Sequence, residues 1–148
     1  MTMTLNFRAI ITGLIVNLLG SLAGAIVVVN FYASRLESAG MSPKDIEQAI
    51  TEALMNPDAH SQLYLGLLAV GTFFDGLSGY VTARKAGFLE YWHVLAMVGL
   101  LVVMQLGAGM MAGGTTGWYC AALLLTIGGA FFGGWRAKMR RLKGGPDA

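Results

Sequence analysis

Four long apolar stretches dominate the pattern of hydrophobic and polar positions along this chain. They cover about residues 9–32, 63–83, 93–112 and 117–135. Each has about 20 residues, which is the length that an α-helix needs to cross a hydrocarbon core of ~30 Å. The pattern therefore predicts an all-α fold, with residues 1–148 forming a single membrane domain built as a bundle of four transmembrane helices.

The polar segment between the first two stretches contains the signal for a short helix over residues 43–55. Ser42 is suited to cap it, Pro43 fits the first helical position, and Asp45 completes an S-x-x-D capping box. One face is apolar and consists of Ile46, Ala49, Ile50, Ala53 and Leu54. We expect an amphipathic helix that either lies over the ends of the bundle or offers a docking surface to a partner chain.

Charge is scarce and unevenly distributed. Only 12% of the residues are charged, about half of the usual fraction in soluble domains. If the four helices alternate in direction, one side of the membrane receives Arg8, Arg84, Lys85, Arg136, Lys138, Arg140, Arg141 and Lys143. The other side receives only Arg35 and Lys44. The positive-inside rule then predicts that both termini are cytoplasmic and that the short helix lies on the outer side. We interpret the basic tail as an anchor on anionic lipid, not as a nucleic-acid site.

One carboxylate, Asp75, is the only ionisable group deep within any apolar stretch. At ~1.5 Å per residue, it lies roughly 13 Å from the basic end of its helix. Asn17, Gln105 and Thr126 fall at similar depths on the other three helices. The sequence thus predicts a midplane cluster of four polar residues, and ionisable groups inside a membrane are candidate functional sites.

The charge of Asp75 leaves several interpretations open, because no Lys or Arg of the chain can reach its depth. The carboxyl is either neutral and hydrogen-bonded to Asn17 or Gln105, or its charge is balanced by water, a transported cation or another subunit. The first alternative makes it a clip between helices. The others make it part of an ion or proton pathway, or a contact with a partner protein.

Small residues recur at helical spacing and predict close contact between helices. The candidate packing positions are Gly13, Gly20, Gly24, Gly71, Gly79, Gly129 and Gly133. A stripe of this kind packs within the bundle or, if it faces outward, forms an oligomer interface.

No catalytic, cofactor or metal-binding motif stands out. His60 and His93 have no companions at metal-ligand spacing, so we expect both at the membrane interface. Cys120 lies in an apolar stretch and is expected to be a small buried core residue.

The segment Gly79-Tyr80-Val81-Thr82-Ala83-Arg84-Lys85-Ala86-Gly87 resembles a junction between helices in small bacterial four-helix membrane proteins, many of them uncharacterised. The resemblance implies a four-span fold in a bacterial inner membrane. It implies no activity.

These observations favour a non-enzymatic, structural or accessory membrane protein that requires no cofactor. It would act in the lipid bilayer through helix packing, in a homo-oligomer or with a membrane-protein partner. The alternative is a proton- or cation-coupled transporter or channel that uses Asp75. A polar lining contributed by several helices would favour the alternative.

Overall fold

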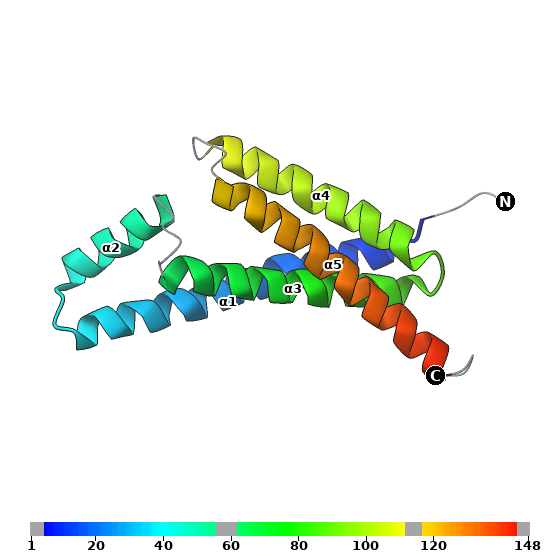
Figure 1. Cartoon of the computed structure of the whole chain (residues 1–148), viewed down its shortest axis with the longest axis horizontal. Coiled ribbons are helices and arrows are strands. Elements are labelled where there is room, and N and C mark those ends of the chain that lie inside the picture. The colour runs from blue at the N-terminus through cyan, green and yellow to red at the C-terminus, as the bar shows by residue number, and fades with distance from the viewer. Residues whose placement is uncertain (1–4, 56–61, 112–116, 145–148) are drawn as a thin grey trace.

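The computed structural model describes residues 5–55, 62–111 and 117–144. This part of the chain forms five helices: α1 (Phe7–Ser38), α2 (Pro43–Met55), α3 (Gln62–Ala86), α4 (Glu90–Met111) and α5 (Gly117–Gly144) (Figure 1). All but α2 are long and apolar enough to cross a membrane. His60 lies outside the described residues.

Helix α1 is longer than the apolar stretch that predicts it. It continues to Ser38, six residues past the expected end, because no residue between 33 and 38 opposes a helix. Gly40 ends it with a positive φ of 85°. The Gly40 N–H donates to the carbonyl of Glu37, and the Met41 N–H donates to that of Leu36 at 3.2 Å. This pattern is a Schellman motif, which favours glycine at the left-handed position.

Helix α2 begins with the capping arrangement that its sequence predicts. The Ser42 hydroxyl accepts from the Asp45 N–H at 3.3 Å and donates to the Asp45 carboxylate at 2.6 Å. Pro43 occupies the first helical position, where its missing N–H costs nothing.

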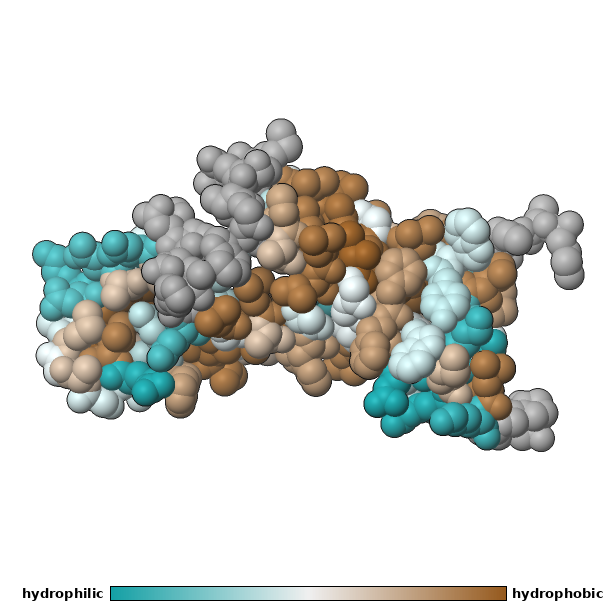
Figure 2. Space-filling view, in the orientation of Figure 1, coloured by the Kyte–Doolittle hydropathy of each residue, from teal (hydrophilic) through white to brown (hydrophobic). Residues whose placement is uncertain are grey.

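Helix α3 is the centre of the bundle and contacts each of the other four helices. In the described residues, α1 and α5 lie on different sides of α3 and do not contact each other (Figure 1). The start of α1 and the ends of α3 and α5 gather at one end of the molecule, which we call the basic end. Helix α2 lies at the opposite end, the α2 end. Figure 2 shows hydrophilic surface at both ends and a hydrophobic band between them.

The buried apolar residues are concentrated in the half of the bundle next to the basic end. This core consists of Ile10, Ala83, Val94, Met97, Val98, Leu101, Ala130 and Ala137. Large apolar side chains elsewhere, such as Phe73, Val27 and Leu124, are exposed on the outside of the bundle. Such a surface is suited to lipid, because hydrocarbon and not water would cover it.

Helices α3 and α5 approach each other closely where both have glycines. We call this contact the glycine seam and define it as Gly76 and Gly79 of α3 facing Gly129 and Gly133 of α5. A Cβ at Gly79 would overlap the Ala130 carbonyl, and one at Gly133 would overlap the Gly76 carbonyl. The two backbones are therefore in direct contact, as small residues allow. Gly76 lies three residues before Gly79 on the same face, but the sequence pattern did not indicate it as a packing position.

Candidate functional site

The four polar residues expected at mid-depth lie together in a polar network of two adjacent hydrogen-bonded pairs. The Asn17 amide of α1 donates to the Asp75 carboxylate of α3 at 2.7 Å. The Gln105 amide of α4 donates to the Thr126 oxygen of α5 at 3.1 Å. Thr126 lines the same cavity as Asp75, so the second pair lies beside the carboxylate.

Each residue of the network comes from a different spanning helix. Asn17, Asp75 and Thr126 are buried, and the exposed fraction of Asp75 is 5%. Buried polar groups require partners, because an unsatisfied one costs ~1–3 kcal/mol. The network therefore brings together side chains of all four spanning helices that are largely removed from the surface.

A cavity of about 420 Å³ begins at this network and extends toward the α2 end. Most of its surface is apolar, and its polar lining residues are Asn17, Ser21, Tyr64, Thr72, Asp75, Gln105 and Thr126. Tyr64 lies eleven residues before Asp75 on α3, or ~16 Å at the helical rise. The cavity thus covers much of the distance between the α2 end and the carboxylate. Neither Tyr64 nor Thr72 was expected at this site from the sequence, although Thr72 lies one turn before Asp75.

On the other side of Asp75 the helices are packed without such a space. Ser78, Thr82 and Met97 are completely buried. The Thr82 hydroxyl donates to the Met97 sulfur at 3.0 Å, and a Cβ at Gly13 would overlap that hydroxyl. The carboxylate therefore lies at the closed end of the cavity, with packed helices between it and the basic end.

No basic side chain of the described residues forms an ion pair with Asp75. The ion pair in that part of the chain joins Arg141 to Glu90 at the basic end. No group of three His, Cys, Asp or Glu residues in residues 5–55, 62–111 and 117–144 is close enough to hold a metal ion. Chemically, the site offers one carboxylate with amide and hydroxyl oxygens nearby. Such groups can hold a proton or a small hard cation.

The candidate glycines differ in what they contact. Gly20 and Gly24 of α1 receive the side chains of Phe74 and Val70 from α3, so this stripe faces into the bundle. Gly13 packs on Thr82, and Gly79, Gly129 and Gly133 belong to the glycine seam. Gly71 lines the cavity instead, and a Cβ there would meet no atom within 4 Å.

His93 and Cys120 differ in burial. His93, near the start of α4, is completely buried between helices. Its Nε2 accepts from the Asn6 N–H at 2.8 Å, so Nδ1 carries the proton and donates to the Leu89 carbonyl at 3.0 Å. Cys120 is exposed, not buried. Helix α5 packs on only part of its circumference, and an apolar stretch in a membrane does not distinguish core positions from lipid-facing ones.

Comparison with known proteins gives no relative from which a role could be transferred. No protein-family model, no curated protein and no solved structure matches the chain. The fold is a helical bundle, and four of its helices are long and apolar enough to cross a membrane. Its function has to be inferred from the site.

Proposed function

We propose that this chain is a small proton- or cation-coupled transporter or channel, in which a proton or a small cation reaches Asp75 through the cavity. The group of polar side chains around Asp75, at one end of that cavity, carries the proposal. In the structure, side chains from four helices come together around one carboxylate.

The shape of the site supports binding in a pathway more than a simple clip between helices. A clip requires only that Asp75 and its partners meet. It does not require Ser21, Thr72 and Tyr64 to line the space that leads away from them. Polar groups inside a membrane span are costly unless they are satisfied, and those lining a water-filled cavity are satisfied by water.

The proposed orientation has both termini in the cytoplasm and α2 outside. It rests on the eight basic residues at the basic end against the two near α2. The cavity would then open outward, and the packed half would close it from the cytoplasm. With Cys120 replaced by alanine, a cysteine at Ser38 should react with an impermeant thiol reagent in intact cells, and one at Lys143 should not. The opposite labelling would reverse the orientation.

The function is tested by flux measurements in reconstituted vesicles. Vesicles that contain the parent protein should pass protons, or Na⁺ or K⁺, faster than empty vesicles under an imposed gradient. Asp75→Asn should abolish this flux, because the amide is nearly isosteric but neither titrates nor carries charge. Thermal unfolding in detergent should show that the variant is folded.

The matched control is Glu47→Gln, the same chemical change on the exposed surface of α2. It should leave the flux unchanged. Parent vesicles no more permeable than empty ones, or an Asp75→Asn flux equal to that of the parent, would contradict the proposed function.

A second candidate is the accessory role, acting through helix packing in an oligomer or with a membrane-protein partner. One observation favours it: Asp75 already accepts a hydrogen bond from Asn17 within the bundle, as a clip between helices requires. In this case Asp75→Asn would keep the fold, and no flux would be found in the parent.

A further inference from the structure

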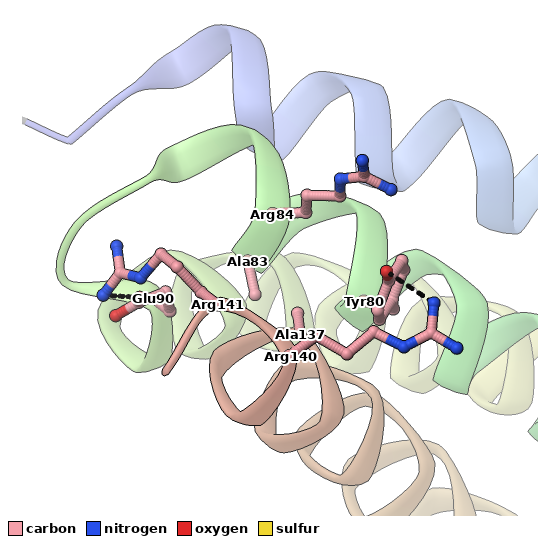
Figure 3. Close-up of a pocket in the computed structure, with 7 residues that line it drawn as sticks. All are labelled: Tyr80, Ala83, Arg84, Glu90, Ala137, Arg140 and Arg141. Carbon is pink, nitrogen blue, oxygen red and sulfur yellow. Dashed lines mark hydrogen bonds and ion pairs between the residues drawn. The ribbon is translucent and has the colours of Figure 1, made fainter. Parts of the chain in front are cut away.

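A second site lies at the basic end, between the last turns of α3 and α5. A pocket of about 310 Å³ is lined by Tyr80, Arg84, Glu90, Arg140 and Arg141 together with two alanines. Figure 3 shows Tyr80 and Arg140 pointing toward one another from the two helices. The Arg140 guanidinium donates to the Tyr80 hydroxyl at 3.4 Å and lies 5.8 Å from the centre of its ring. Arg84, one turn further along α3, also lines the pocket.

The pocket has an excess of positive charge. Its one carboxylate, Glu90, pairs with Arg141 on the far side of the pocket (Figure 3). Arg141 also donates to the Gly87 carbonyl in the turn between α3 and α4. Arg84 and Arg140 are exposed and form no ion pair within the described residues. Two guanidinium groups are thus left facing a pocket with no counterion from that part of the chain.

An apolar groove of about 740 Å³ adjoins this pocket and shares Tyr80 and Arg140 with it. It follows the outer side of the glycine seam, where Gly76, Gly128 and Gly133 present no side chains. Phe73, Leu77 and Phe132 also line it. The groove extends from Tyr80 back to Thr72, which is ~12 Å along the helix. It lies within the segments suited to span the membrane, and Arg136 stands at its basic end over the Phe132 ring, 5.9 Å from the centroid.

We propose that the pocket and the groove together bind one anionic phospholipid. The phosphate would lie between Arg84 and Arg140, and an acyl chain would fill the groove along the glycine seam. Guanidinium groups bind phosphate through several N–H donors, and basic pockets between transmembrane helices are suited to anionic head groups. This inference concerns a site separate from Asp75 and does not depend on the transport proposal.

Charge complementarity and the shape of the site select this occupant over two others. A free phosphate would use the arginines but would leave the apolar groove empty. A helix from a second, parallel copy of the chain could fill the groove, but it would bring its own arginines to the same depth. Like charges would then repel each other at the basic end. A phospholipid supplies both the negative charge and the apolar chain.

Native mass spectrometry of the detergent-solubilised protein tests the proposal. The protein is titrated separately with phosphatidylglycerol, phosphatidylcholine and glycerol phosphate. One phosphatidylglycerol should bind per chain, about tenfold more tightly than phosphatidylcholine, and glycerol phosphate should bind far more weakly. Equal affinity for the two lipids, glycerol phosphate as tight as phosphatidylglycerol, or a dimer without bound lipid would overturn it.

Three variants locate the site. The double change Arg84→Gln with Arg140→Gln should weaken phosphatidylglycerol binding about tenfold or more, because it removes the two guanidinium groups that would bind the phosphate. Gly128→Leu should weaken binding several-fold by filling the groove, because a Cβ at Gly128 meets no atom within 4 Å. Lys138→Gln is the matched control: it removes one positive charge from α5, but Lys138 lies over Tyr91, away from the pocket, at 4.8 Å from the ring centre.

The control should bind phosphatidylglycerol as the parent does. If Lys138→Gln weakens binding as much as the arginine pair, the attraction is a property of the whole basic end and the proposed site is wrong. If the arginine double variant does not fold, Gly128→Leu and the lipid comparison on the parent decide the matter.

Discussion

The two halves of this bundle differ in how closely their helices pack. Next to the basic end, Ser78, Thr82, Val94 and Met97 are buried to 2% exposure or less. On the other side of Asp75, the same four helices leave a cavity of about 420 Å³. The difference shows that one half can hold the bundle together while the other keeps space around a carboxylate.

Residue size explains much of the difference. Along the glycine seam, α3 and α5 approach until their backbones touch. Around the cavity, the lining residues are mostly leucines and polar side chains, together with Met104, Ala122 and Gly71, and a Cβ at Gly71 would meet no atom within 4 Å. Hydrocarbon solvates apolar side chains as well as a protein core does, so helices in a membrane associate mainly through close contact of this kind. We therefore expect the stability of the bundle to depend mostly on the half next to the basic end.

The largest effect should come from adding one methyl group to the glycine seam. Gly79→Ala places a Cβ against the Ala130 carbonyl, which belongs to a backbone and cannot move aside alone. Overpacking of this kind costs about 1–3 kcal/mol. The control is Gly128→Ala on α5, where the added atom meets nothing within 4 Å and alanine is the better helix former.

Unfolding in a denaturing detergent, monitored by circular dichroism, measures both variants. Gly128→Ala should be as stable as the parent or slightly more so. If Gly79→Ala is equally stable, the two helices do not approach as closely as the structure indicates, and the contrast between the halves is lost.

A smaller effect is expected from Asp75, at the boundary between the halves. Asp75→Leu removes an acceptor and leaves Asn17 without it, which should cost about 1–2 kcal/mol on the scale of interhelical hydrogen bonds. Asp75→Asn should keep the stability of the parent, because its amide oxygen still accepts from Asn17. The same unfolding assay compares them.

An Asp75→Leu variant as stable as the parent would mean that the network contributes nothing to folding. That result would leave ion binding or a contact with a partner protein as the role of the carboxylate. A large loss in Asp75→Asn as well would show instead that the charge itself is required for the fold.

The sequence alone predicted the elements well. The number of long helices and the start of α2 at its capping box follow from length and local hydrogen bonding. These are properties of a segment by itself. Helix α1 runs beyond the apolar stretch 9–32 to Ser38, because apolarity indicates what a membrane can cover and not where a helix ends.

Only the tertiary structure decided which face of each helix meets which partner. The sequence contained Gly71 and Gly79 in one stripe, yet one lines the cavity and the other touches a backbone. It placed Cys120 in the core, which is wrong, and it did not indicate that His93 is completely buried between helices. In water, burial separates apolar from polar faces, but in a membrane both the lipid-facing and the core-facing sides of a helix are apolar. Composition therefore indicates that a helix is suited to span a membrane. The rotation of that helix about its own axis is determined by packing against its neighbours.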